Sequence, residues 1–396
     1  MVEHHVPDSR RASVHKFVLA DPRGDRRFLA ESASAVPHEI FSAIWHAGPL
    51  QRNLSLYGDS GPVSLTNYWR QAMRSVEWAQ KHPATQNLDL GALSKIFPMV
   101  FFVDGVEVYT NNEFVVWCWS MQTTAGSGDA WDTRFPLLIL DHAKMHDAEV
   151  QKKVFADVAN YTDWEVRVLE SKRFPPKWYM HQDFDKASAR YQRRGQLLAD
   201  GFGAVFTGIK GDRKSRKEVH GFARNYHCTF KCERCFAMSP TTKLSVPSLW
   251  FTRFDRNAGW RKHQVTHDLY ERVDRVLSPY LGVRGFRLEM AYGDMTHDLY
   301  IGAGLHHVSN HCVLLAELGL VRDDAGASVT NVDLALAWLT IKMRRWCKAN
   351  GIKYPPGKFT RAGMNRKYKT TYPELSTSWK AAVSYTHLTL PTKRIV

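Results

Sequence analysis

The stretch from Gly201 to Ala237 constrains the fold and the chemistry of this chain more than any other part of its sequence. It opens with a short apolar run, Gly203 to Ile209, which predicts a buried strand. Asp212 follows the run, and after it come a basic segment and three closely spaced cysteines. A carboxylate, a cationic cluster and soft metal ligands are therefore neighbours along the chain. Together they favour chemistry on a phosphate backbone.

The composition narrows the class of partner. The chain has 396 residues, of which 44% are hydrophobic, so it can bury a sizeable core. Its formal net charge of +15 favours a polyanionic partner, most often nucleic acid, although an ordinary basic enzyme is the plainer alternative. We see no apolar run approaching the ~18 residues of a membrane span and no signal peptide, so we expect an intracellular protein without a membrane partner.

The order of the expected elements points to a fold class. Strands are expected over residues 98–109, 113–121 and 135–140, and Asp-Gly and Asn-Asn turn signals predict that they form an antiparallel meander. A helix from about 147 to 159 and the strand at 203–209 follow. Three strands, a helical insertion and a fourth strand are the order of the ribonuclease-H-like fold. We therefore predict an α/β protein: a ribonuclease-H-like mixed sheet with flanking helices and a zinc-binding insertion.

The chain is expected to comprise four segments. A basic N-terminal region with helices covers 1–97, and its first residues, 1 to about 36, are expected to form a poorly ordered arm or a weakly structured lead-in. The ribonuclease-H-like core with the cysteine cluster covers 98–237, and a mainly helical remainder covers 238–382. Residues 383–396 include VSYTHLTLPT, which looks like a translated sequencing adapter, so we expect an artefact there and a native chain that continued differently. The clearest single helix is expected over Asn331–Asn350, with Asn331 as its cap.

Two aspartates follow apolar runs and are the first candidates for catalysis. Asp104 comes after Val100–Val103, where Asp104-Gly105 is expected to break the first strand, and Asp212 comes after the run that ends at Ile209. Phosphodiester cleavage by the two-metal route needs carboxylates that converge on Mg²⁺ or Mn²⁺, and adjacent strands of one sheet can bring two acids to the same edge. The plainer alternatives are an Asp104-Gly105 hairpin turn and a helix N-cap at Asp212.

The cysteine cluster predicts a structural zinc site. Cys228, Cys232 and Cys235 lie within a few residues of one another in a chain with six cysteines. The spacing leaves the fourth ligand open: His297 and His227 are the leading candidates, and the others are His220, His306, His307 and His311. The alternative is a group of free cysteines in the core.

Basic residues surround Asp212 and could bind a phosphate backbone without reading its sequence. The candidates are Lys210, Arg213, Lys214, Arg216 and Lys217. A run of charge is otherwise a solvated face, and its proximity to Asp212 and the cysteines favours the binding role.

These motifs carry a resemblance to a known family. The block GDRKSRKEVHGFARNYHCTFKCERCFA, residues 211–237, resembles the Asp…Ala…Gly…CxxC block of CACTA-type and related eukaryotic cut-and-paste transposases. Asp104-Gly105 resembles the first acidic motif of that family. Asp294-Met295-Thr296-His297 resembles its Asp-x-Met-His motif, displaced by one residue, and Tyr372-Pro373-Glu374-Leu375 resembles a later segment.

The resemblance implies a nuclear DDE/D transposase that acts on DNA, with a structural Zn²⁺ and catalytic Mg²⁺ or Mn²⁺. Water would first cut the DNA to leave a 3′-hydroxyl, which would then attack target DNA. The first two acids would be Asp104 and Asp212, and the third is Asp294, Glu317 or a residue beyond position 382. If the third acid is missing, the chain is inactive as it stands. Assembly into a homo-oligomer is an open option.

Two other classes of function remain. A non-catalytic, zinc-stabilised nucleic-acid-binding protein needs the cysteines and the basic face but not Asp104. A structural or regulatory protein could carry an incidental ribonuclease-H-like core. Metal-dependent cleavage of DNA would separate the transposase hypothesis from both.

Overall fold

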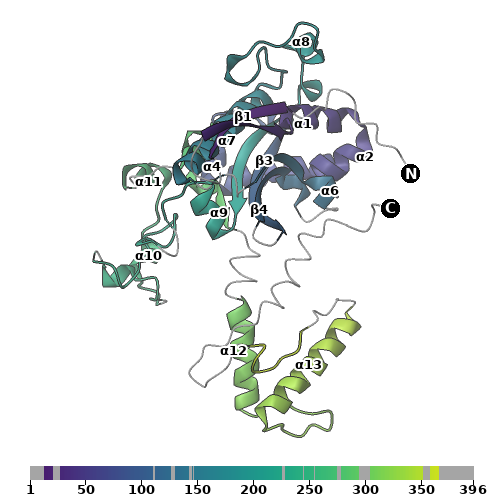
Figure 1. Ribbon diagram of the computed structural model, residues 1–396. Helices are drawn as coiled ribbons and strands as arrows, with labels where there is room; N and C mark the ends of the chain where they lie inside the picture. The colour runs from purple at the N-terminus through teal and green to yellow at the C-terminus, as the bar shows by residue number, and fades with distance from the viewer. Residues whose placement is uncertain are drawn as a thin grey trace. The chain divides into compact units, whose positions relative to one another are not determined.

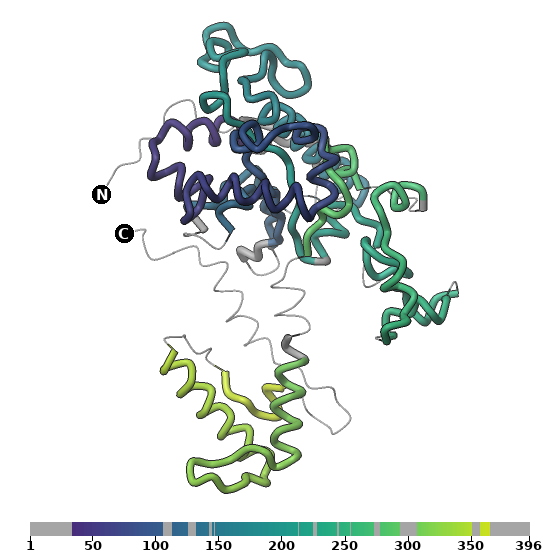
Figure 2. The backbone as a smooth tube through the Cα atoms, turned by 180° about the vertical axis from the view of Figure 1, so that it is seen from behind, coloured from purple at the N-terminus to yellow at the C-terminus, as the bar shows by residue number. Residues whose placement is uncertain are grey.

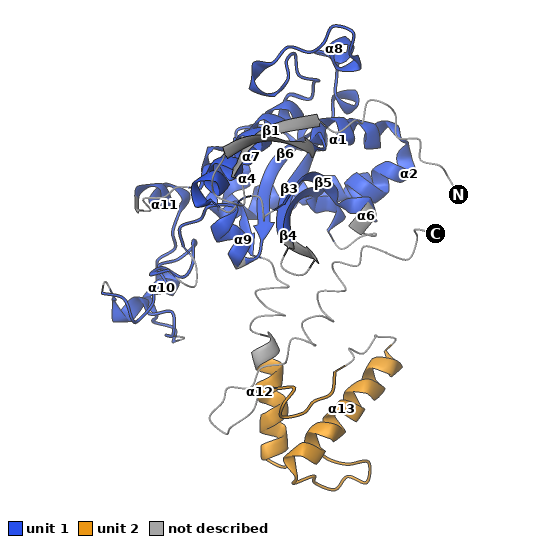
Figure 3. Cartoon of the chain, viewed as in Figure 1, with its two compact units in different colours: residues 1–293 blue, residues 294–396 orange. Residues whose placement is uncertain are grey.

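The computed structural model describes residues 13–20, 27–109, 112–125, 130–141, 145, 147–224, 228–243, 245–253, 255–273, 278–293, 304–350 and 357–364. The chain divides into two compact units, Met1–Gly293 and Asp294–Val396 (Figure 3). The expected boundaries at 97 and 237 both lie within the first unit, and the four-segment organisation stays a prediction. Each unit is described by itself.

A mixed sheet forms the centre of the first unit (Figure 1). Strands β3 (Ile96–Tyr109), β4 (Asn112–Met121) and β5 (Phe135–Asp141) pair antiparallel in sequence order. Strand β6 (Gly203–Gly211) lies on the other side of β3 and parallel to it, and β7 (Ala291–Gly293) is parallel to β6. The expected meander and the general α/β class are therefore confirmed.

Two further strands extend the sheet beyond β5, in the order β1-β2-β5-β4-β3-β6-β7. Strands β1 (Ser13–Ala20) and β2 (Arg27–Ser34) form an antiparallel hairpin, and Ser34 pairs with Leu138 of β5. The expectation of a poorly ordered arm over residues 1 to about 36 is wrong for these strands. The hydrogen bonds between strands use backbone groups that every residue except proline provides. A polar segment can therefore pair at the edge of a sheet even though its side-chain pattern does not predict a strand.

Helices cover the two faces of the sheet. Helix α7 (Ala148–Ser171) packs on one face, where Phe155 lies 5.7 Å from Trp117 between ring centroids. Asp147 caps this helix by accepting hydrogen bonds from two backbone N–H groups, as the sequence predicts, but the helix continues well past residue 159. On the other face, the indole of Trp78 hydrogen-bonds to Tyr292 of β7. Helices therefore cover both faces of the sheet.

The helices before β3 are α1 (Pro37–His46), α2 (Pro49–Arg52), α3 (Pro62–Ser75), α4 (Glu77–Lys81) and α5 (Leu90–Leu93), with a π-helical turn at Asn53–Tyr57. The later short helices of this unit are α6 (Ala130–Thr133), α8 (Ala189–Arg193), α9 (Arg213–Glu218), α10 (Gly259–Lys262) and α11 (His267–Val273). Single 3-10 turns lie at Gln122–Thr124, Tyr179–His181, Ala199–Gly201, Pro247–Leu249, Pro279–Gly282 and Leu288–Met290.

The cysteine-bearing segment between α9 and β7 leaves the body of the sheet (Figures 1 and 2). It is held by isolated backbone bridges, Phe230 with Met238 and Cys235 with Gln264. These bridges give the segment a defined path, although it contains little regular secondary structure.

The second unit is a pair of helices with its own small core. Helix α12 (Gly304–Glu317) and helix α13 (Val332–Ala349) bury Val313, Ala316 and Leu336. Asn331 caps α13 by accepting a hydrogen bond from the backbone N–H of Leu334, so the predicted helix and its cap are confirmed. None of the helices in the described part of the chain has the length and the apolar content that a membrane span needs.

Candidate functional site

The register of two parallel strands brings the two aspartates together. Phe102 of β3 pairs with Lys210 of β6, and two residues later each chain carries an aspartate, Asp104 and Asp212. Asp212 comes directly after β6 and still has extended backbone dihedral angles. Neighbouring strands lie roughly 4.8 Å apart, so the same register carried two residues further would set the two aspartates side by side.

Both aspartates belong to the same face of the sheet. One residue earlier, Val103 Cγ1 lies 3.5 Å from the position that a Cβ atom on Gly211 would occupy, so these two residues share the buried face. Successive side chains of a strand alternate between faces, and Asp104 and Asp212 therefore share the opposite one. That face is half-buried at this level. Burial raises the pKa of the Cys118 thiol there to about 11, and the nearby charge of Asp104 adds to the increase.

Asp104 lies inside β3 and not at its end. It pairs with Val116, Gly105 pairs with Val115, and the strand continues to Tyr109. The interpretation of Asp104-Gly105 as a hairpin turn is wrong, and so is the expected strand end at Asp104. Glu113 Oε1 lies 1.8 Å from where a Cβ on residue 105 would be, so the glycine makes room for a cross-strand carboxylate rather than for a turn.

Asp212 is the N-cap of α9, as its plainer interpretation predicts. Its Oδ1 accepts a hydrogen bond of 2.6 Å from the backbone N–H of Ser215. A carboxylate has two oxygens and about four acceptor positions, so one capping bond leaves most of its capacity to bind a cation. The cap also fixes the direction of the side chain, which is useful in a metal ligand.

The five basic candidates differ in their availability. Lys217 is exposed, Lys210 is half-buried, and Lys214 lies 3.1 Å from a carboxylate oxygen of Glu113. The side chain of Arg213 is outside the described residues. The prediction that Arg216 binds a phosphate backbone is wrong. Its guanidinium group lies 2.5 Å from the carboxylate of Glu233, and its side chain is only 10% exposed. A cation enclosed in this way supports the fold and is not presented to a phosphate backbone.

Two of the three cysteines meet in a turn. The thiol of Cys235 hydrogen-bonds to Cys232, and the backbone N–H of Arg234 donates to Cys232 Sγ at 3.3 Å. The hydrogen bond from Cys235 lowers the pKa of the Cys232 thiol to about 6, and the same contact with burial raises the pKa of Cys235. A CxxC turn that directs N–H groups at sulfur stabilises a thiolate, which is the form that binds a metal.

The remaining zinc candidates are not gathered around this pair. In the described ranges, no three His, Cys, Asp or Glu side chains form a group that could hold a metal ion. His227, Asp294 and His297 lie outside the described residues, as does the side chain of His306. His307 and His311 lie close to each other in the second unit, with ring centroids 4.1 Å apart.

His220 is a histidine of the core. It is 1% exposed, and its ring lies 5.0 Å from that of Tyr280 between centroids. Burial, together with the charge of Arg216, lowers its pKa to about 3, so it is neutral at physiological pH. Another histidine, His263, precedes Gln264, whose backbone forms a bridge with Cys235. No short-range spacing in the sequence reveals that approach.

The cysteine turn is attached to the helix that Asp212 caps. Glu233, between the paired cysteines, forms the buried ion pair with Arg216 of α9. Arg224 donates a hydrogen bond to the carbonyl oxygen of Cys235 and lies over the ring of Phe230, 4.7 Å from its centroid. The turn and α9 therefore form one packed assembly beside the carboxyl end of β6.

The third acid stays a prediction. Glu317 is the last residue of α12 and is exposed on the second unit. Asp294 lies outside the described residues, and residues 365–396 do as well. The first unit thus supplies two acids of the expected set.

No protein-family model matches the sequence, and neither a curated protein nor a solved structure matches it.

Proposed function

We propose that this protein cleaves DNA strands with divalent metal ions, as a transposase-like enzyme with a ribonuclease-H-like core. The observation that carries the proposal is the β3–β6 register, whose last pair, Phe102 with Lys210, lies two residues before Asp104 and Asp212. A hairpin turn and an isolated helix cap would have no reason to be adjacent.

The chemistry of these residue types fits phosphodiester cleavage. Carboxylate oxygens are the ligands that Mg²⁺ and Mn²⁺ prefer. Bound as a pair, such ions would activate the attacking oxygen and stabilise the leaving one. In this arrangement Asp104 and Asp212 hold the cations, and the exposed Lys217 with Lys214 attracts the DNA backbone. Asp294 or Glu317 is the proposed third ligand.

The arrangement of strands supports the ribonuclease-H-like assignment. The fold hypothesis rests on three strands, a helix and a fourth strand, with the first and fourth strands adjacent so that their acids meet. Strands β3, β4 and β5, helix α7 and strand β6 follow in that order, and β6 pairs with β3. The assignment would fail if Asp104 and Asp212 bound no shared cation.

We further propose a structural zinc ion on Cys232 and Cys235. The support is the thiolate-stabilising turn and its attachment to α9. Cys228 and a histidine would complete four ligands, and the histidine candidates are His297 and His227 from the sequence and His263 from the bridge at Gln264. Metal analysis of purified protein should find one zinc, and Cys232→Ser should remove it. Cys347→Ser, which changes a buried cysteine of the second unit, is the control that should retain zinc.

The test of the main proposal combines metal binding with cleavage. Titration with Mn²⁺, followed by electron paramagnetic resonance, should show binding that Asp104→Asn and Asp212→Asn each weaken. Nicking of supercoiled plasmid in Mn²⁺ should fall at least about a hundredfold in the same variants, the scale for removing one group that stabilises transition-state charge. Asp183→Asn, at an exposed position away from the site, is the control.

The outcomes separate the hypotheses. Mn²⁺ binding that depends on both aspartates, without cleavage, supports an inactive transposase-like chain. DNA binding with neither Mn²⁺ binding nor cleavage supports the alternative, a non-catalytic zinc-stabilised nucleic-acid-binding protein. Equal Mn²⁺ binding by wild type and Asp104→Asn would defeat the proposed active site.

A further inference from the structure

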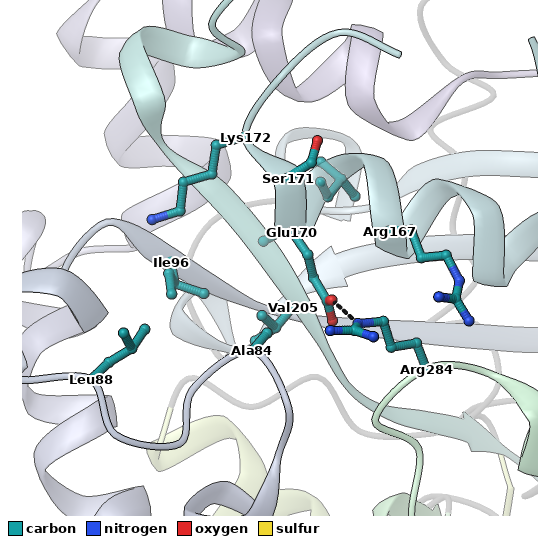
Figure 4. Close-up of a pocket in the computed structure, with 11 residues that line it drawn as sticks. Ala84, Leu88, Ile96, Arg167, Glu170, Ser171, Lys172, Val205 and Arg284 are labelled. Carbon is teal, nitrogen blue, oxygen red and sulfur yellow. Dashed lines mark hydrogen bonds and ion pairs between the residues drawn. The ribbon is translucent and has the colours of Figure 1, made fainter. Parts of the chain in front are cut away.

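A cavity of about 470 Å³ opens at the amino ends of β3 and β6 (Figure 4). Its floor is apolar and is formed by Ile96 at the start of β3 and Val205 near the start of β6, with Leu88 at the rim. This volume lies within the range of small-molecule sites, roughly 300–1,000 Å³. The floor therefore offers a surface for an apolar or planar group.

The cavity is separate from the pair of aspartates. Ile96 and Asp104 are eight positions apart on one strand. At roughly 3.3 Å per residue, about 26 Å separates them. Because β6 is parallel to β3, its amino end meets this cavity while its carboxyl end meets the aspartates. A ligand in the cavity does not contact the proposed active site.

Lys172 supplies an available cation at the edge of the cavity. It ends α7 in a left-handed conformation with φ of 57°, and its Cγ lies 2.9 Å from the position that a Cβ on Gly203 would take. The side-chain stem is thus laid across the start of β6 and its direction is fixed. Among the residues that the structure describes, no carboxylate forms an ion pair with Lys172.

The two arginines of the cavity are held by acids. Arg284 Nε lies 2.6 Å from Glu170, and Arg167 Nε lies 2.7 Å from Asp163. Figure 4 shows Arg284 and Glu170 facing each other on the side of Val205 away from Lys172. A guanidinium fixed by a carboxylate presents a flat face on which a planar ring can stack.

The environment of Lys172 favours an anion. Burial lowers the pKa of Lys172, and the charge of Lys95 lowers it further. Both effects mean that the ammonium group is short of stabilising partners in the free protein. An anion bound beside it would relieve this cost, and phosphate is a common partner of a fixed lysine.

We propose that this cavity binds a nucleotide unit, with its phosphate on Lys172 and its base on the floor of Ile96 and Val205 beside Arg284. The lysine would bind the phosphate, and the apolar floor and the fixed guanidinium groups would contact the two faces of the base. The source is either a free nucleotide or the phosphorylated end of a nucleic-acid strand. The site goes beyond the proposed cleavage activity and does not depend on Asp104 or Asp212.

The probe is adenosine 5′-monophosphate, titrated by calorimetry into the purified full chain. Lys172→Gln keeps the stem over Gly203 and removes the charge, and it should weaken binding by about tenfold, because a hydrogen bond to a charged group contributes about one decade in affinity. Leu88→Glu places an acid at the rim and should also weaken binding. Leu88 is 37% exposed, so this change spares the fold. Lys186→Gln, at an exposed lysine outside the cavity, should bind as the wild type does.

Two further arms identify the source and test each part of the ligand. If the mononucleotide fails to bind but a short 5′-phosphorylated single strand binds in a Lys172-dependent manner, the strand end is the ligand. Adenosine that binds as tightly as the monophosphate would overturn the role of Lys172. Equal binding of both probes by Lys172→Gln and wild type would overturn the site. Asp104→Asn should leave nucleotide binding unchanged, which separates this test from that of the cleavage activity.

Discussion

The two ends of the β3–β6 strand pair carry opposite chemistry. Beyond the last pair of their register, toward the carboxyl end of β6, Asp104 lies within β3 and Asp212 directly follows β6, and both are half-buried. At the amino ends, a fixed lysine and two arginines surround an apolar cavity, and all three come from elements outside the two strands. Register alone creates the acidic end, whereas the cationic end requires α7 and the loop before β7 to converge.

The two ends are also stabilised differently. Near the carboxyl end, the buried pair of Arg216 and Glu233 joins α9 to the cysteine turn. At the amino end, α7 meets β6 by close backbone packing, since a Cβ on Gly203 would lie 2.2 Å from the carbonyl oxygen of Leu169. An ion pair is the main stabilising contact near the carboxyl end of β6, and close backbone packing is the main one at its amino end. Substitutions in the ion pair and at Gly203 should therefore lower stability by different amounts.

The largest effect is expected at the ionic end. Glu233→Gln should lower the free energy of unfolding by about 3–5 kcal/mol, because it leaves Arg216 buried without its opposite charge. Glu113→Gln removes the partner of Lys214, whose side chain is 51% exposed, and should cost below about 1 kcal/mol. Urea unfolding followed by tryptophan fluorescence measures both, and equal losses would contradict the structural role of the Arg216 pair.

At the amino end of β6, even a methyl group at position 203 should lower the free energy of unfolding. Gly203→Ala should cost about 1–3 kcal/mol, because backbone of α7 must move to admit the methyl group. Gly105→Ala is the matched change near the carboxyl end, where the obstacle is the flexible end of Glu113. Its cost in the same unfolding assay should be clearly smaller. The reverse order would show that the amino end is not tightly packed.

Each end also contains a buried neutral histidine. Burial lowers the pKa of His82, near Arg284, to about 4, and burial lowers that of His220, near Arg216, to about 3. The unfolded chain, with histidine pKa near 6.5, binds more protons below that pH, so stability is lost as pH falls. At pH 5.5 each histidine should contribute a loss of about 1.2 kcal/mol relative to pH 7.

Replacement of either histidine by glutamine tests this sign. His82→Gln and His220→Gln should each flatten the change in urea midpoint between pH 7 and pH 5.5, whatever their stability at pH 7. A double substitution should flatten it by about the sum, because the two sites lie at different ends. An unchanged pH dependence in both variants would mean that the histidines are not the groups that titrate.

The smallest effect concerns the exposed cation beside the acidic end. Lys217→Gln should reduce the slope of log affinity for DNA against log salt concentration by about one, since one phosphate contact is lost. Lys152→Gln, on the exposed side of α7, is the matched control and should retain the full slope. Fluorescence anisotropy at several salt concentrations measures both. Equal slopes would remove α9 from the proposed DNA-binding surface.

Some features of the fold and the candidate site are local enough to be predicted. The apolar runs at 98–103 and 203–209 mark β3 and β6 because burial selects for them whatever the rest of the fold. Asp147 and Asn331 cap their helices by reaching only two or three residues along the chain. The positions of Asp104 and Asp212 relative to these runs follow from the same local pattern.

Other features depend on contacts between distant residues. Arg216 looks like its basic neighbours in the sequence, and only its burial against Glu233 distinguishes it. Asp104-Gly105 has the composition of a turn, but the ladder with β4 keeps it in a strand. The hairpin of β1 and β2 is likewise a product of edge pairing. Local pattern could not decide these cases, because in each one the deciding partner comes from another element.

The sequence by itself determined where the strands and the capped helices lie, and it placed an acid after each of two apolar runs, because these depend on burial pattern and on hydrogen bonds within a few residues. Only the tertiary structure decided that β3 and β6 are neighbours in a register whose last pair lies two residues before both acids. It alone also brought Lys172, Arg284 and the strand ends together around one cavity. These contacts depend on how the whole sheet packs. The free energy of that packing comes from interactions between distant segments, so a short segment cannot predict it.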